Sequence, residues 1–413
     1  MRVLIQYIGT LVNVREENNR LRGAELAELP VIHDAYLLME DGIISGYGAM
    51  KDLDAKIPQK PEHVIDSKGG FVLPAWCDSH THLVFAGSRE SEFVDKIRGM
   101  SYAEIAARGG GILNSSRRLN ETSEDQLFVD AWKRLQSVMK LGTGAIEIKS
   151  GYGLTEEGEL KMLRVIKRLK EKSPIPIKAS FLGAHTYPVE YKENHEGYLE
   201  MLIDKLLPQI AAEGLADYID VFCEQGFFSV AEMERVVKAG AAFGLKAKLH
   251  INQLNSLGGI ESAVRMKAVS VDHLEVMTDT DIRSLASSDT MGTLLPTAAY
   301  FLRMPFQPAR TLIDAGACIA LASDYNPGSS PSGNMNQVVS MSCIQMRMLP
   351  EEAIQAATLQ GAFAMELEKE IGSIALGKRA NLILTEPIPS LAYLPYAFGS
   401  NLIRTVFING EPV

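Results

Sequence analysis

The sequence has few cysteines, no long hydrophobic run and an excess of negative charge. Its four cysteines, Cys77, Cys223, Cys318 and Cys343, show no metal-ligand spacing, and three of them lie in apolar, strand-like runs. No segment approaches the ~18 apolar residues of a membrane span. The start, MRVLIQYIGTLVNV, lacks the basic patch and cleavage pattern of a signal peptide. We therefore expect reduced thiols and a cytoplasmic protein.

The charge balance excludes two classes of partner. The net charge is -10, whereas nucleic acids and anionic membranes attract a basic surface. We expect neither partner, and an anionic small-molecule substrate would need local arginines. The 413 residues, 46% of them hydrophobic, can bury the core of one large domain and a smaller one.

Short apolar runs alternate with helical patterns through the middle of the chain. Strands that are nearly all apolar are typical of a parallel sheet covered by helices on both faces. Eight such runs predict a (β/α)₈ TIM barrel, with a doubly wound open sheet as the alternative. The runs are residues 71–80, 145–150, 176–185, 218–224, 246–251, 268–274, 290–297 and 318–324.

Helix starts are marked at several points between these runs. Ser123 with Gln126, and Ser229 with Glu232, fit capping boxes ahead of helical patterns. Pro350 stands at a suitable first position for the helix EEAIQAATLQGAFAMELE, which would close the barrel domain.

The two ends of the chain have a different character from the middle. The first ~65 residues are β-like pieces with turns between them and no helix, and the tail from about residue 380 is similar. We expect the ends to meet in a small β-sandwich beside the barrel. The predicted division is 1–68 and 376–413 for the small domain and 69–375 for the barrel.

The strongest chemical signal is a set of histidines at strand ends. In His80-Thr81-His82 the two imidazoles are two residues apart, so strand alternation points both into the barrel. His250, His273 and Asp324 end the fifth, sixth and eighth runs, and the C-terminal strand ends of a barrel gather at one face. The alternative is that each histidine is an ordinary core or loop residue.

Three imidazoles and one carboxylate suit one Zn²⁺ or iron ion per subunit and leave a position open for water. Zinc lowers the pKa of bound water from 15.7 to about 7, which gives a hydrolase its nucleophile. We expect Asp324 to take the proton and return it to a leaving nitrogen.

The order of these residues resembles the amidohydrolase superfamily, and longer strings resemble the imidazolonepropionase family. The strings are DSHTHLVFAGSRESEF, GGGI, EIKSGYGL, FLGAHTYPVEY, DVFCEQGFFS, HINQLNSLGG, VDHLE and DYNPGSSPSGNM. This resemblance implies hydrolysis of the cyclic amide of imidazolone propionate to N-formimidoyl-glutamate, in histidine degradation.

The resemblance also implies roles for the residues at the strand ends. The metal ligands would be His80, His82, His250 and Asp324, with His273 polarising the carbonyl or holding the attacking water. The fourth strand closes as VFCE without the modified lysine of two-metal members, so one metal is expected. Lys149 ends an earlier strand, where it is either structural or supports the ligands.

Several loop residues are candidates for binding the substrate. Arg89 is expected to clamp the propionate, because a guanidinium matches a carboxylate in shape and charge. Tyr152, between two glycines, and His185, at the end of the third run, would contact the ring. Donors in the loop beyond Asp324 are expected to bind the substrate carboxylate or ring, with turn formation as the alternative for each; these residues are Asn326, Gly328 and Ser329.

Two positions depart from the superfamily pattern. Gln253 stands where superfamily deaminases carry a glutamate that acts as a general acid. An amide cannot donate a proton as an acid, so we expect Gln253 to orient the substrate by hydrogen bonds. Asn381 replaces a usual aspartate and is expected to affect only the small domain. A deaminase or another cyclic amidohydrolase, and a non-catalytic scaffold, remain the competing functions. Fold analogy suggests a homodimer.

Overall fold

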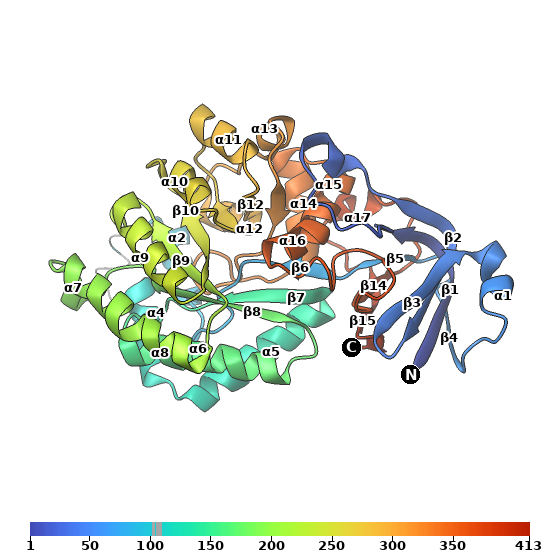
Figure 1. Cartoon of the computed structure of the whole chain (residues 1–413), viewed down its shortest axis with the longest axis horizontal. Coiled ribbons are helices and arrows are strands. Elements are labelled where there is room, and N and C mark those ends of the chain that lie inside the picture. The colour runs from blue at the N-terminus through green and yellow to red at the C-terminus, as the bar shows by residue number, and fades with distance from the viewer. Residues whose placement is uncertain (101–103, 105–109) are drawn as a thin grey trace.

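The structure, a computed structural model, describes residues 1–100, 104 and 110–413. A barrel and a smaller β-domain lie side by side, and both chain termini belong to the smaller domain (Figure 1). The first glycine of the GGGI string, Gly109, lies outside the described residues. Within the described ranges, no helix is both long enough and apolar enough to cross a membrane.

Eight parallel strands form the barrel, and each is hydrogen-bonded to the next in chain order. A parallel bridge between Thr81 and Tyr325 joins the extensions of the first and last strands and closes the barrel. The predicted TIM barrel is confirmed and the doubly wound alternative is wrong. The strands are β6 (Trp76–Asp78), β7 (Thr143–Lys149), β8 (Ile177–Ala184), β9 (Tyr218–Cys223), β10 (Lys246–Ile251), β11 (Ser270–His273), β12 (Met291–Leu294) and β13 (Ile319–Leu321).

Helices fill the connections and cover the outside of the barrel (Figure 1). The Ser123 hydroxyl accepts a hydrogen bond from Gln126 N, and the reciprocal capping box of Ser229 and Glu232 is present. The helices of this layer are α2 (Glu90–Ile97), α4 (Ile112–Glu121), α5 (Glu124–Lys140), α6 (Glu156–Lys172), α7 (His195–Glu200), α8 (Leu207–Glu213), α9 (Val230–Ala242), α10 (Gly259–Arg265), α11 (Asp279–Ala286), α12 (Pro296–Leu302), α13 (Ala309–Asp314) and α14 (Met335–Met346).

The helix predicted after Pro350 is wrong as a single element. It begins at Pro350 but divides into α15 (Pro350–Ala357) and α16 (Leu359–Ala364), because Thr358 leaves helical geometry at φ -120° and ψ -90°. In α16, a Cβ on Gly361 would collide with the carbonyl oxygen of Cys77 in β6. The break lets the second segment lie directly against the first barrel strand.

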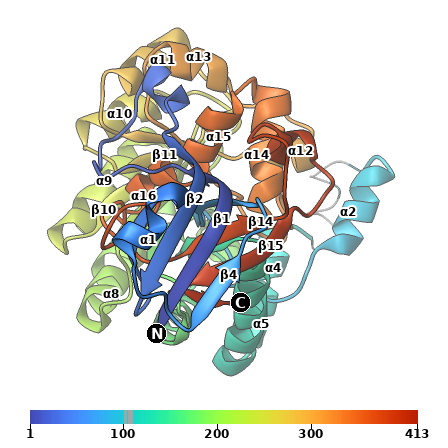
Figure 2. The same cartoon turned by 90° about the vertical axis from the view of Figure 1, so that its right-hand side faces the viewer.

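The small domain is one mixed sheet built from both chain ends, so their predicted meeting is confirmed (Figure 2). Its described strands follow a single hydrogen-bonded path, β16-β15-β14-β5-β1-β2-β3, with β4 also paired to β1. Asp41 and Gly42, both at positive φ, form the tight turn between β2 and β3. The bounds are β1 (Arg2–Val12), β2 (Val31–Glu40), β3 (Ile43–Ala49), β4 (His63–Asp66), β5 (Phe71–Pro74), β14 (Leu382–Thr385), β15 (Ile403–Ile408) and β16 (Glu411–Pro412).

The remaining short elements connect these strands and cover parts of the surface. They are the helices α1 (Leu53–Lys56) and α17 (Tyr393–Tyr396), the 3-10 turns η1 (Gly23–Ala27), η2 (Met50–Asp52) and η3 (Val189–Tyr191), and the π-helical segment η4 (Met201–Leu206). Alternate residues of β1 fill two separate clusters, with Val3 and Ile5 in one and Leu4 in the other. The sheet therefore buries apolar side chains on both faces.

The predicted strand over residues 71–80 divides at Ala75. Residues before it, in β5, pair with β1 and β14 of the small domain, and residues after it, in β6, pair with β7 of the barrel. Ala75 N donates to Asn381 O at 2.9 Å, while Trp76 N donates to Gly142 O at 2.8 Å. The change of hydrogen-bond partner marks the passage between the two sheets. The division at residues 68 and 375 stays a prediction.

Asn381 joins the two domains, which corrects the expectation that it affects only the small one. Its Nδ2 donates to Gly144 O of barrel strand β7 at 2.9 Å, and its Oδ1 accepts from Asn409 N at 2.7 Å. The side chain is almost fully buried. A buried polar group that loses its partner costs more than the bond itself contributes, so this amide is a structural link.

We expect Asn381→Ala to lower the free energy of unfolding by about 1–3 kcal/mol, because the buried Gly144 O would be left without this partner and Asn409 N would lose its acceptor. Urea denaturation monitored by circular dichroism measures the change. The matched control is Asn19→Ala at an exposed position, which should stay within about 0.5 kcal/mol of the parent. Equal effects of the two substitutions would contradict the linking role.

Candidate metal centre and active site

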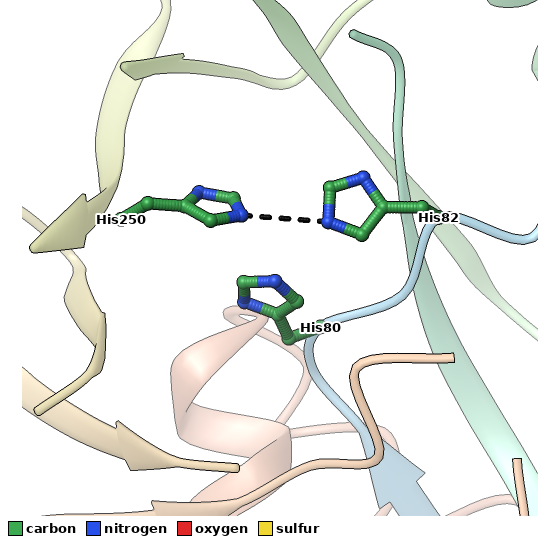
Figure 3. A group of neighbouring side chains, drawn as sticks. All are labelled: His80, His82 and His250. Atoms are coloured by element: carbon green, nitrogen blue, oxygen red, sulfur yellow. Dashed lines mark hydrogen bonds between the residues drawn. The ribbon is translucent and has the colours of Figure 1, made fainter. Parts of the chain in front are cut away.

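Three histidines form a tight cluster at the C-terminal end of the barrel. His80 and His82 follow β6 and His250 lies in β10, and the ligand atoms of all three are within 4.8 Å of one another. His82 Nε2 and His250 Nε2 are 3.4 Å apart, and the three rings face one another (Figure 3). All three side chains are buried. The cluster has the geometry of a metal-binding site.

Asp324 and His273 complete the group of strand-end residues. Asp324 Oδ1 lies 3.5 Å from His80 Nε2 and 3.6 Å from His82 Nε2. The His273 ring centroid is 5.3 Å from that of His250. Both residues have positive φ, 52° for Asp324 and 91° for His273, a conformation that is uncommon outside glycine. The structure thus brings all five predicted residues together.

Two buried aspartates orient the imidazoles. His80 Nδ1 is 2.7 Å from Asp272 Oδ2, and His250 Nδ1 is 3.0 Å from Asp220 Oδ2. Since an ionised carboxylate only accepts hydrogen bonds, each Nδ1 carries the proton and each Nε2 keeps its lone pair. These Nε2 atoms point into the cluster, as metal-ligating histidines require.

The electrostatics also fit a metal ion. Burial, assisted by Lys149 and by the neighbouring rings, holds the pKa of His80, His82 and His250 well below the usual range, so the rings are neutral. Neutral imidazole is the metal-binding form. His80 Nε2 is buried without a hydrogen-bond partner in the described part of the chain. Burial also raises the pKa of Asp324 to about 7, although His273 opposes the shift.

His273 differs from the neighbouring histidines in the direction in which its pKa is shifted. Burial lowers its pKa, but the Glu275 carboxylate, 3.4 Å from His273 Nδ1, more than compensates, and the pKa is raised overall. Gln307 Nε2 donates to the same Glu275 oxygen at 2.9 Å. When it is protonated, an imidazole donates from both nitrogens, and the raised pKa of His273 favours this form, which can stabilise developing negative charge.

A cavity of about 60 Å³ opens above the cluster, with room for several water molecules. All but one of its lining residues were singled out by the sequence, and the exception is Phe222 in β9. Three predicted residues lie outside the lining: His80 is beneath it in the cluster, and Arg89 and Gly328 meet at the loop beyond β13. The lining residues are His82, Tyr152, His185, Phe222, His250, Gln253, His273, Asp324, Asn326 and Ser329.

Tyr152 and His185 form one wall of the cavity, with ring centroids 5.7 Å apart. His185 Nδ1 lies 3.0 Å from Gly151 O, and because a carbonyl only accepts, Nδ1 carries the proton and Nε2 is left as an acceptor. Burial lowers the pKa of His185 to about 4. Gly151 has φ 107°, and a Cβ there would lie 2.9 Å from both His185 Nδ1 and Leu182 O. Glycine is therefore required for this wall.

Arg89 is held by a partner that the sequence did not reveal. Its Nε and Nη2 donate to Glu92 Oε2 at 2.8 and 2.7 Å, and Glu92 Oε1 accepts from Gly111 N at 3.0 Å. This arrangement leaves Nη1 directed at the loop beyond β13, where a Cβ on Gly328 would collide with it. The missing Cβ lets the guanidinium lie against that loop.

Asn326 organises the loop beyond β13. Its Nδ2 donates to Asp324 O and Ser329 Oγ, both at 2.7 Å, and its Oδ1 accepts from Gly328 N and Ser329 N at 2.8 Å. Among the described contacts these groups serve the loop itself, which is the turn-forming alternative expected for them. Ser329 Oγ is 3.3 Å from Asp324 Oδ2 and faces the cavity.

Gln253 reaches the cavity from the loop after β10. Glu224, which ends the fourth predicted run, fixes this loop by accepting hydrogen bonds from Leu254 N at 2.8 Å and Asn255 N at 3.2 Å. Its side chain is almost fully buried. The end of the fourth strand, where no lysine stands, therefore supports the loop of Gln253.

The inward face of the barrel is polar, which corrects the description of the strands as nearly all apolar. Alternate residues of β7, β9, β10 and β11 point inward and form a buried network of charges and hydroxyls beneath the cluster. The sequence did signal it, because charged or hydroxyl-bearing residues stand two apart in AIEIKS, KAKLHI and AVSVDHL. The network contains Glu147, Lys149, Asp220, Lys248, Ser270 and Asp272.

Solved structures with the same fold include two deaminases. An adenosine deaminase from Xanthomonas campestris with bound zinc matches with a TM-score of 0.71 and 17% identity, covering 99% of this chain and 92% of that one. The guanine deaminase of E. coli matches with a TM-score of 0.73 and 14% identity, covering 100% of this chain and 99% of that one. At these identities the likeness shows the fold alone.

Sequence comparisons are far closer. The model of the amidohydrolase family matches residues 71–413. The imidazolonepropionase of Flavobacterium johnsoniae is 57% identical over 413 residues, which is the full length of both chains. That of Parabacteroides distasonis is 41% identical over 410 residues, covering 99% of this chain and 98% of its own. The chain therefore belongs to the amidohydrolase family and, within it, to the imidazolonepropionases.

Proposed function

We propose that the protein hydrolyses the cyclic amide bond of 4-imidazolone-5-propanoate to give N-formimidoyl-L-glutamate, a step of histidine degradation. Water adds to the ring carbonyl carbon, the bond from that carbon to the ring nitrogen breaks, and the nitrogen takes up a proton. One observation carries the proposal: neutral imidazoles and a carboxylate converge at one end of the barrel, in a chain 57% identical to an imidazolonepropionase over its whole length.

We propose that a single Zn²⁺ or iron ion is held by His80, His82, His250 and Asp324. Support comes from the Nε2 atoms that point into the cluster and from the distances of Asp324 Oδ1 to His80 and His82. Both metals accept imidazole and carboxylate ligands. When bound, such an ion acidifies a coordinated water and polarises a carbonyl.

Asp324 and His273 would carry out the proton transfer and the charge stabilisation. Asp324 accepts the proton of the attacking water and passes it to the departing ring nitrogen. His273, whose pKa is raised by Glu275, donates a hydrogen bond to the oxygen on which negative charge develops. The positive φ of both residues turns their side chains toward the same cavity.

Three side chains that line the cavity would hold the ring of the substrate. The free Nε2 of His185 is an acceptor suited to a ring N–H, because Nδ1 is committed to Gly151 O. Tyr152 lies beside it and offers a hydroxyl. Gln253 would orient the ring through its amide, without transferring protons.

Arg89 would bind the propionate carboxylate through Nη1, the nitrogen that Glu92 does not occupy. The Glu92 carboxylate fixes the orientation of the guanidinium before the substrate arrives, which reduces the entropy lost on binding. Ser329 lies on the neighbouring loop and faces the cavity, and Gly328 leaves room there for the guanidinium, so both would complete this subsite. The homodimer and the cytoplasmic location stay predictions.

The direct test follows 4-imidazolone-5-propanoate with the purified chain. We expect its absorbance to fall without release of ammonia, and N-formimidoyl-L-glutamate to appear in equal amount. Removal of metal with a chelator should lower the rate by more than about 100-fold, and added Zn²⁺ or iron should restore it. Ammonia release in step with substrate loss would indicate a deaminase, and full activity of chain shown to be metal-free would exclude the proposed chemistry.

Replacing His273 separates charge stabilisation from metal binding. We expect His273→Asn to lower kcat about 10²–10³-fold, the usual effect of losing one donor to a developing oxyanion, with the bound metal retained. Steady-state kinetics and metal analysis by mass spectrometry measure the two effects. Loss of metal in this variant would show that His273 is a ligand instead.

Replacing Arg89 tests the carboxylate subsite. We expect Arg89→Met combined with Glu92→Gln to raise KM about 10–100-fold, because a charge-assisted contact of about 1.5–3 kcal/mol is lost. The second substitution prevents Glu92 from being buried without its counter-ion. Arg117→Met, which removes the same charge from an exposed position on α4, is the control and should leave KM unchanged. A similar rise in both would point to long-range charge rather than contact.

A further inference from the structure

We propose that Lys149 is a positioning residue of the metal centre: its ammonium group holds the two aspartates that fix His80 and His250. The inference rests on the proposed metal site and adds a residue that lies outside the cavity and touches neither imidazole. It gives Lys149, which the sequence left between a structural and a supporting role, a specific task.

The contacts run from one nitrogen to two imidazoles. Lys149 Nζ is 2.8 Å from Asp220 Oδ2 and 3.4 Å from Asp272 Oδ2. Asp220 Oδ2 in turn lies 3.0 Å from His250 Nδ1, and Asp272 Oδ2 lies 2.7 Å from His80 Nδ1. Each aspartate oxygen that meets the lysine also meets an imidazole. The same atoms therefore set the position of the carboxylate and the direction of the ring.

The barrel places these groups in one layer. Lys149 ends β7, Asp220 lies in β9 and Asp272 in β11, which are the second, fourth and sixth barrel strands. Side chains from alternate strands of a barrel share a layer of the interior. His80 follows the first strand and His250 lies in the fifth, so both come from the other set of alternate strands. The layer that contains Lys149 and the two aspartates therefore supports the histidines of the neighbouring layer.

Charge makes the lysine necessary to this layer. All three side chains have no exposed surface, and a third carboxylate, Glu147, lies 2.7 Å from Lys149 Nζ. An ammonium group has three N–H donors, which matches the three carboxylates around it. Without it, Asp220 and Asp272 would be buried beside each other with less positive charge to hold them apart, and buried carboxylates in that state rearrange or lose their charge.

Lys248 provides a matched comparison within the same network. It is equally buried and pairs with the same Glu147 at 2.9 Å, but its other contacts are Ser270 Oγ at 3.0 Å and Ala364 O at 2.8 Å. Lys248 therefore has a similar structural role. Against the effect of burial, its charge also lowers the pKa of Asp272, but among the described contacts it reaches that aspartate only through Ser270, whose hydroxyl donates to Asp272 Oδ1. Loss of either lysine should cost stability, whereas of the two only Lys149 forms ion pairs with the aspartates that hold the imidazoles.

The experiment compares Lys149→Met with Lys248→Met in the full chain, using Zn²⁺ as the probe. Zn²⁺ affinity is measured by competition with a chromophoric chelator at fixed pH, and folding by thermal denaturation of the metal-free proteins. We expect both variants to melt earlier. Lys149→Met should weaken Zn²⁺ binding about 10–100-fold, the usual effect of losing a group that supports metal ligands, and Lys248→Met less than about 3-fold.

Lys149→Gln, which keeps an N–H donor without the charge, is measured in parallel in case the methionine variant does not fold. Unchanged Zn²⁺ affinity in the folded Lys149 variants, or the same loss in Lys248→Met, would overturn the proposal. If the parent chain binds no Zn²⁺, and His250→Ala does not change this result, the metal site itself is refuted. The two failures are thus distinguishable.

Discussion

Charged side chains that are buried inside a barrel must neutralise one another, and this constraint governs the interior of the molecule. The buried network contains ion pairs of Glu147 with Lys149 and Lys248. It continues toward the histidine cluster through Asp220 and Asp272. A typical barrel interior is filled by branched apolar residues. Here the polar filling gives the imidazoles above it fixed hydrogen-bond partners, so the site is already shaped in the protein.

Regular strands position some residues of this site, and turns with positive φ position the others. The strands fix where His250, Asp220 and Asp272 stand, because parallel hydrogen bonding leaves little freedom along β9, β10 and β11. The residues that face the cavity from the strand ends, His273 and Asp324, leave the regular conformation through positive φ. In a regular strand adjacent residues point to opposite faces, so His273 would point away from the barrel interior that Asp272 faces. The positive φ of His273 turns its side chain toward the cavity instead.

The parts of this arrangement that were predictable follow local rules. Apolar runs of strand length and the capping residues Ser123 and Ser229 identified the elements, and their order predicted the barrel. The parts that were missed depend on contacts between distant segments. The helix breaks at Thr358 in spite of a good helical sequence, because α16 must approach β6. No local pattern marks the hydrogen bond from Arg89 to Glu92.

By itself, the sequence determined the strand periodicity, the chain positions of the histidines and the resemblance of its motifs, because these depend on residue type and spacing. The tertiary structure decided which nitrogen of each imidazole faces the cluster, why Lys149 is buried, and how Asn381 and Ala75 connect the two sheets. These features depend on which atoms meet when the barrel closes. Strands far apart in the chain supply them, and no local pattern records the distance between their side chains.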